Sequence, residues 1–137
     1  MEIIYNLNEN HIKQLCELYQ QEWWTKGRTL EATKECVSGS QICIGIVDSE
    51  ELVGFARVIT DYTFKAFIFD VIVRIDQRGK GLGGKLVSLI KSHEKLSRVK
   101  HFELYCLPEL DEFYSQYGFS IPSEIQLMRH TTDAHTT

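Results

Sequence analysis

The sequence has few of the features that mark membrane or nucleic-acid-binding proteins. Its apolar stretches are only a few residues long, whereas a membrane-spanning helix needs roughly 20. The first residues lack the basic and apolar regions of a signal peptide. Basic residues do not predominate, because 15 Lys and Arg stand against 19 Asp and Glu, and nucleic-acid binding rests on a basic surface. We therefore expect a cytoplasmic protein without membrane or nucleic-acid partners.

The cysteines and histidines lack the spacing of metal ligands. Zinc ligands usually occur in closely spaced pairs, and small disulfide-rich domains carry many more cysteines per residue. The five histidines show neither an HxH nor an HExxH pattern, and no CxxC pair is present among the four cysteines, Cys16, Cys36, Cys43 and Cys106. We expect four reduced thiols and no bound metal.

Proline and repeated sequence are also scarce. Only two prolines occur, and no repeat, low-complexity tract or linker divides the chain. Its 137 residues, 43% apolar and 25% charged, fit the size and composition of one globular domain. We therefore predict a single domain over residues 1–137.

The spacing of apolar residues predicts alternating helices and strands. An i, i+3, i+4 pattern indicates helices, and alternation indicates strands. Residues 66–73 are almost continuously apolar, as in a central strand covered on both faces. The predicted order is a strand at 2–7, a helix from Ile12 to Trp23 capped by Asn8 or Asn10, a helix at 30–38, strands at 42–47, 52–60 and 66–73, a helix from Leu82 to Leu96, a strand at 101–106, a helix from Pro108 to Gly118, and a strand at 125–130. This order predicts an α/β sandwich with a mixed sheet, in which the three central strands form an antiparallel meander.

A glycine-rich loop lies between the strand at 66–73 and the following helix. Four of the six residues from Gly79 to Gly84 are glycine. Without β-carbons in the way, an anion can approach the free amides at the start of the helix, where the helix dipole also favours negative charge. Arg78 and Lys80 add positive charge to this loop. The pattern predicts a phosphate-binding loop.

Two common phosphate motifs fit the loop poorly. Gly79 to Lys85 satisfies GxxxxGK, but the next residue is Leu86, which has no hydroxyl to bind magnesium. The same glycines satisfy GxGxxG, yet three strands precede the loop and only 53 residues follow Gly84, too few to complete a doubly wound domain. Neither ATP hydrolysis nor dinucleotide binding is favoured.

A third pattern points to a family. Residues 70–86 resemble the acetyl-CoA-binding segment of the GNAT superfamily of N-acetyltransferases, whose Q/R-x-x-G-x-G/A signature falls on Arg78, Gly81 and Gly83. Residues 113–119 resemble the family's later FYxxxGF segment. The resemblance implies a mixed, mostly antiparallel sheet with helices on both faces and a splay between the fourth and fifth strands.

The resemblance also implies a cosubstrate and how the chain holds it. Acetyl-CoA would donate acetyl to a primary amine by direct attack in a ternary complex, without an acyl-enzyme. Backbone groups of Val71, Ile72 and Val73 would hold the pantetheine arm. The pyrophosphate would be held by the amides of Arg78, Gly79, Lys80, Gly81, Leu82, Gly83 and Gly84.

The family's usual general acid matches Tyr114, although a tyrosine packed in the core is the alternative. For the general base there are two candidates. Asp70 is an acid within an apolar strand, but it also suits structural hydrogen bonds. Glu103 is the other candidate, and a solvated sheet edge is its alternative role. Many members of the family carry an Asn near Cys106, and this chain has none there.

The acceptor is not specified by these motifs. The family places specificity residues between its first two helices, where Trp24 either lines the acceptor pocket or covers the edge of the core, and Trp23 continues the core stripe. A small-molecule amine is favoured. A protein or peptide acceptor, and a non-catalytic acyl-CoA sensor, stay open as alternatives, as does a homodimer.

Overall fold

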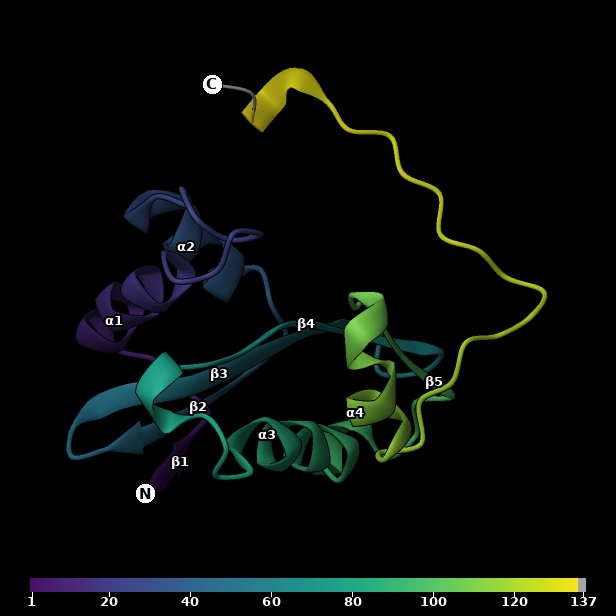
Figure 1. Ribbon diagram of the computed structural model, residues 1–137, viewed down its shortest axis with the longest axis horizontal. Coiled ribbons are helices and arrows are strands. Elements are labelled where there is room, and N and C mark those ends of the chain that lie inside the picture. The colour runs from purple at the N-terminus through teal and green to yellow at the C-terminus, as the bar shows by residue number, and fades with distance from the viewer. Residues whose placement is uncertain (136–137) are drawn as a thin grey trace.

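The protein is built on a five-stranded sheet with strand order β1-β2-β3-β4-β5. The structure is a computed structural model and describes residues 1–135 (Figure 1), so the last two residues of the expected 1–137 domain lie outside the described part. The strands are β1 (Glu2–Ile4), β2 (Ile42–Asp48), β3 (Glu51–Thr60), β4 (Lys65–Val73) and β5 (His101–Leu104).

The sheet is mixed, as predicted. The first four strands pair antiparallel with their neighbours, and β5 runs parallel to β4. Short turns join β2 to β3 and β3 to β4, which suits antiparallel pairing, whereas a parallel pair needs a longer crossover. The crossover from β4 to β5 contains α3 (Leu82–Lys91). The antiparallel meander is therefore confirmed.

Helices cover both faces of the sheet (Figure 1). On one face, Leu15 and Tyr19 of α1 pack with Phe55 of β3. On the other, Leu86 and Ile90 of α3 pack with apolar residues of β2, β3 and β4. The helix α1 spans Glu9–Tyr19. The other helices are α2 (Leu30–Ser38), α4 (Asp111–Ser115) and the 3₁₀ turns Ile75–Gln77, Glu94–Leu96, Pro108–Leu110 and Asp133–His135. None of the helices in residues 1–135 is long and apolar enough to cross a membrane.

The fourth and fifth strands separate partway along their length. Their pairing joins residues 65–68 of β4 to 101–104 of β5 and then stops. The rest of β4, residues 69–73, still borders β3, but no strand among the described residues pairs with its other side. The predicted splay is thus confirmed, and it leaves one backbone edge of β4 without ladder partners.

A β-bulge at Asp70 lies where this unpaired edge begins. Phe69 pairs with Arg57 and Ile72 with Phe55, so two residues of β4 stand opposite the single Ala56. Asp70 has φ +56°, a conformation that L-residues seldom adopt. The extra residue reverses the alternation of β4. Ile68 packs on the α3 side of the sheet, and Ile72 packs on the α1 side.

Three helices are shorter than predicted. The one expected from Pro108 to Gly118 consists of the 3₁₀ turn Pro108–Leu110 and of α4, which ends at Ser115. The helix α1 ends at Tyr19, and Trp23 is 74% exposed, so the prediction that Trp23 continues the core stripe was wrong. The cause is Gln20, whose side chain binds the carbonyl of Arg28 and the amide of Gly27 and so closes a loop after α1. The helix α3 stops at Lys91, and Leu96 reaches the core from a separate 3₁₀ turn.

The predicted strand at 125–130 does not form within the described residues. A strand needs an edge to pair with, and this segment runs away from β5 (Figure 1). Its apolar side chains are exposed, among them Ile125, Leu127 and Met128. The periodicity of the segment alone therefore misled the prediction.

Candidate functional site

The glycine loop presents the N-terminus of α3 beside the unpaired edge of β4. Gly81 is the N-cap residue, in the left-handed conformation with φ +79°, and Gly79 has φ +80°. None of the described side chains caps the helix at this end. The first-turn amides of a helix have no partners within the helix, so these donors are free to meet an anion. This geometry suits the phosphate-binding role predicted for the loop.

The two basic residues of the loop differ in their surroundings. Arg78 donates to the carbonyl of Val73, 3.3 Å away, and forms an ion pair with Glu22. Lys80 is exposed, and its amino group donates to the side-chain oxygen of Gln77 at 3.1 Å. The Arg78 side chain therefore ties the loop to the end of β4, whereas Lys80 extends from the loop surface.

Gly84 has a role that the sequence did not reveal. A β-carbon at Gly84 would lie 1.9 Å from the hydroxyl oxygen of Tyr117, and one at Gly83 would lie 3.3 Å from the ring of Phe113. These two glycines let the segment that contains α4 approach α3 closely. The glycine run therefore serves packing at its C-terminal end as well as backbone conformation at Gly79 and Gly81.

Gln21 secures the end of β4. Its amide nitrogen donates to the carbonyl of Val73 at 2.9 Å, and its side-chain oxygen accepts from the amide of Ile75 at 3.3 Å. The connection between α1 and α2 is thereby fixed to the strand that the pantetheine arm was expected to follow. Sequence reasoning missed Gln21, since no local pattern marks a contact between residues so far apart.

Tyr114 lies on α4 and is buried, as expected if it is a core tyrosine. Its ring packs edge-on against Phe113 and Phe119, with centroids 4.9 and 6.1 Å away. Burial, and next the neighbouring Cys106 thiol, raises the pKa of Tyr114 to about 12. The hydroxyl therefore keeps its proton at neutral pH. A protonated hydroxyl can donate a proton to a leaving group, so burial and the acid role are compatible.

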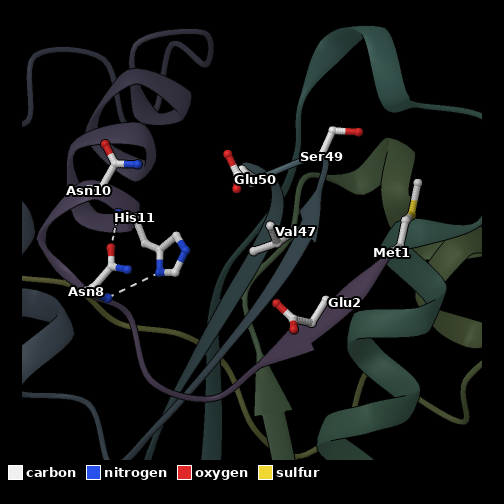
Figure 2. Close-up of a pocket in the computed structure, with 8 residues that line it drawn as sticks. All are labelled: Met1, Glu2, Asn8, Asn10, His11, Val47, Ser49 and Glu50. Carbon is white, nitrogen blue, oxygen red and sulfur yellow. Dashed lines mark hydrogen bonds between the residues drawn. The ribbon is translucent and has the colours of Figure 1, made fainter.

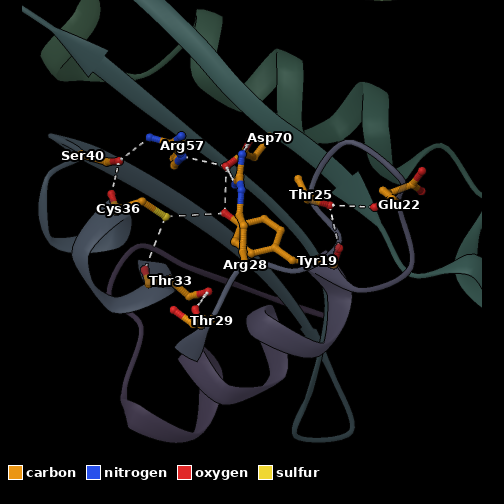
Figure 3. A network of polar contacts seen from close by, with 10 residues as sticks. All are labelled: Tyr19, Glu22, Thr25, Arg28, Thr29, Thr33, Cys36, Ser40, Arg57 and Asp70. Carbon is orange, nitrogen blue, oxygen red and sulfur yellow. Dashed lines mark hydrogen bonds and ion pairs between the residues drawn. The ribbon is translucent and has the colours of Figure 1, made fainter. Parts of the chain in front are cut away.

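Asp70 is the centre of a buried polar network (Figure 3). Tyr19 donates to its carboxylate at 2.8 Å, and Arg28 and Arg57 each donate at 2.7 Å. The side chain of Asp70 is only 5% exposed. Burial on its own would raise the pKa of this carboxyl, but the hydrogen bonds and charges of the two arginines outweigh it and lower the pKa.

This environment favours the structural role that the sequence left open for Asp70. A base must accept a proton readily, whereas this carboxylate is held ionised by two cations and a hydroxyl. Its partners Tyr19, Arg28 and Arg57 come from α1, from the α1–α2 connection and from β3, and the sequence linked none of them to Asp70.

Glu103 and Trp24 lie outside this network. Glu103 pairs with Lys65, and its side chain is 29% exposed, at the part of β5 that still pairs with β4. Trp24 lies in the α1–α2 connection and is 40% exposed. The structure thus brings neither of them to Asp70 through a direct hydrogen bond or ion pair.

A separate surface depression of about 620 Å³ lies on the β1–β2 side of the sheet (Figure 2). It is lined by the N-terminus, the start of α1 and the β2–β3 turn. Its most distinctive polar pair is already engaged, because the Asn8 side chain accepts from the amide of His11 and the His11 ring accepts from the amide of Asn8. These bonds cap α1, so the pair has a structural purpose.

Comparisons with known proteins agree with the geometry. The family model described as an acetyltransferase (GNAT) domain matches residues 38–121. An uncharacterised N-acetyltransferase, ycf52, of Pyropia yezoensis is 30% identical over 118 residues, 83% of this chain and 66% of that protein. The chain therefore spans just under two thirds of this relative's length.

Solved structures share the fold. A Xanthomonas campestris protein belonging to the GNAT family superposes with a TM-score of 0.81 and 26% identity, covering 100% of this chain and 99% of that one. An aminoglycoside 6'-N-acetyltransferase complexed with coenzyme A has a TM-score of 0.62 and 26% identity over 72% of this chain and 57% of its own. With its splayed β4 and β5 and its glycine-capped α3, this chain belongs to the GNAT acetyltransferase family.

Proposed function

We propose that the chain is an N-acetyltransferase that moves acetyl from acetyl-CoA to a primary amine, carried by a small molecule. The observation that carries this proposal is the juxtaposition of two features. Gly81, in the left-handed conformation, caps the N-terminus of α3 and leaves its first amides without a side-chain partner. The unpaired edge of β4 ends at Val73, shortly before the same loop. One feature suits a diphosphate and the other suits an extended amide-containing arm.

The residues fit acetyl-CoA in a definite order along the chain. Backbone groups of Val71, Ile72 and Val73 would hold the pantetheine arm at the open edge of β4. Amides of the loop would hold the pyrophosphate, and the exposed Lys80 would add positive charge beside it. When bound, acetyl-CoA supplies the acetyl group as a thioester.

The chain's own groups would then support attack by the amine. A backbone N–H on the unpaired edge of β4 would stabilise the negative charge that develops on the thioester oxygen. Tyr114, which keeps its proton because its pKa is raised to about 12, would protonate the departing thiolate. For the base, we favour Glu103 or an ordered water over Asp70, because Asp70 is already held by three donors.

Calorimetric titration of acetyl-CoA tests the carrying observation, using Gly81→Ala against Gly27→Ala. Both glycines have positive φ and no neighbour within 4 Å of a built β-carbon, so both substitutions strain the backbone by about 1–2 kcal/mol. Only Gly81 caps α3. We expect roughly tenfold weaker binding in Gly81→Ala, equivalent to about 1.4 kcal/mol, and binding within twofold of wild type in Gly27→Ala.

Thiol release with a panel of amines and peptides tests the reaction. Absence of acetyl-CoA binding would overturn the proposal. Binding without turnover would favour the acyl-CoA sensor, and turnover with peptides alone would favour a protein acceptor. A cytoplasmic location and a homodimer stay predictions.

A further inference from the structure

Three aromatic rings gather where β4 and β5 separate. The centroids of Phe67 and Phe69 lie 6.2 Å apart, and the ring of Tyr105 lies 6.3 Å from the first and 6.1 Å from the second. Tyr105 follows the last residue of β5, and Phe69 immediately precedes the bulge. The three rings, which we call the aromatic triangle, therefore border the gap between the two strands.

The aromatic triangle lies on the sheet face opposite α3. Ala66 and Ile68 pack into the cluster that contains α3, and side chains alternate along a strand, so Phe67 and Phe69 point to the other face. The two phenylalanines are only half-buried, and Tyr105 is 52% exposed. Apolar area of this kind, left open beside the gap, is available to a ligand.

Tyr114 lies near the end of β5, because, besides burial, the thiol of Cys106, which directly follows Tyr105, is close enough to raise the pKa of Tyr114. It belongs to α4, whose Phe113 ring lies beside Gly83 of α3. In direct attack, the nucleophile and the proton donor for the leaving group act on different sides of the reacting carbonyl. An amine that approaches across the aromatic triangle would meet this requirement.

The charged side chains beside the aromatic triangle are positive or are paired with an opposite charge. The Arg57 guanidinium stacks on Phe69 at 4.9 Å and is paired with Asp70, to which Arg28 also binds. Lys65 is paired with Glu103. The surface therefore offers ring area but little unpaired negative charge. Such a surface favours an amine attached to an apolar group and disfavours a polycation.

We infer that the aromatic triangle is the acceptor-binding surface, and that it takes primary monoamines carrying an aryl or comparably apolar group. This inference rests on the proposed function and names its acceptor class. An aryl ring buried on the triangle is expected to raise kcat/KM by roughly ten- to a hundredfold over a short alkylamine, given the usual gain from burying a side chain of that size.

The test compares 2-phenylethylamine, ethylamine and spermidine as acceptors, with thiol release as the readout. The variant is Tyr105→Ala, and the matched control is Phe64→Ala, which removes an aromatic ring that is 62% exposed in the β3–β4 turn. We expect Tyr105→Ala to raise the KM for 2-phenylethylamine about tenfold. The KM for acetyl-CoA should stay unchanged, and every constant of Phe64→Ala should match wild type.

Each other outcome overturns the inference. It is wrong if wild type prefers spermidine, if it does not use 2-phenylethylamine, or if Tyr105→Ala leaves that KM unchanged. A prior titration with acetyl-CoA separates this from failure of the proposed function. If acetyl-CoA binds and the aryl preference is missing, only the acceptor assignment falls. If acetyl-CoA does not bind, both fall.

Discussion

Among single residues, the Tyr114 hydroxyl has the most specific expected effect on catalysis. Replacing Tyr114 by Phe removes the proton donor and keeps the ring that packs on Phe113 and Phe119. We expect kcat to fall by roughly 10²–10⁴-fold, the usual contribution of a general acid, with acetyl-CoA binding little changed. Steady-state kinetics with Tyr5→Phe as control checks this, and near-normal turnover in Tyr114→Phe would remove the assignment.

Replacing Asp70 is expected mainly to lower the free energy of unfolding. Asp70→Ala leaves Arg57 and Arg28 without their buried partner, a change that typically costs about 3–5 kcal/mol. The control is Asp76→Ala, whose carboxylate pairs with Arg74 at the surface, and it should leave the free energy of unfolding nearly unchanged. Urea denaturation measures the free energy of unfolding of both variants. Equal losses would show that the Asp70 network stabilises the fold no more than a surface ion pair does.

The sequence could indicate Asp70 but not its partners. An acid in an apolar strand is conspicuous in any sequence, so Asp70 was a natural candidate. Its donors Tyr19 and Arg28 lie 51 and 42 residues away along the chain. Contacts at that separation are set by how α1 packs on the sheet, and no local spacing encodes them. The structural role therefore became visible only in the folded chain.

At the level of elements, the close contact between α3 and the α4 segment depends on Gly84. In Gly84→Ala the new methyl group would overlap the Tyr117 hydroxyl, and overpacking of this kind typically costs about 1–3 kcal/mol. Adding Tyr117→Ala should relieve the overlap, so the double variant should lose less stability than the sum of the two single variants. Additive losses in urea denaturation would contradict the contact.

Elements with explicit end signals could be predicted best. The helix α2 runs from Leu30 to Ser38, the bounds predicted from the sequence, and it lies between Thr29, whose side chain caps it, and Gly39. The core strands were also found, because short apolar runs rich in strand-forming residues and bounded by polar turns are typical of buried strands. The errors at Trp23 and at 125–130 share a cause. In both places periodicity was present, but the chain lacked the helical continuation or the partner edge that would have used it.

For the whole molecule, the Asp70 network joins the helical layer to the sheet, and this predicts a pH dependence of stability. The folded protein holds the pKa of Asp70 below its ordinary value of 3.8, so as pH falls below about 4 the unfolded chain binds a proton that the folded chain resists. The Asp70 network should therefore contribute its full stabilisation at neutral pH and lose it progressively in acid. Urea midpoints between pH 3 and 7 measure the decline.

The matching control is Asp70→Asn, which has no carboxyl to titrate at this position. Its unfolding midpoint should be lower at neutral pH and should change less between pH 5 and 3 than that of wild type. A wild-type curve that matches the variant's slope would assign the acid sensitivity to other carboxylates.

The extra residue in β4 gives one strand two successive phases. Up to Phe69 the odd-numbered side chains serve the α1 face, and from Ile72 onward the even-numbered ones do. The strand can therefore line an acceptor surface with its first half and seal the hydrophobic layer beneath α1 with its second. Deleting Asp70 would close the bulge and leave Val71 and Val73 on the α3 side, where they already pack, so the extra residue adds one more side chain, the carboxylate itself, to the α1 face.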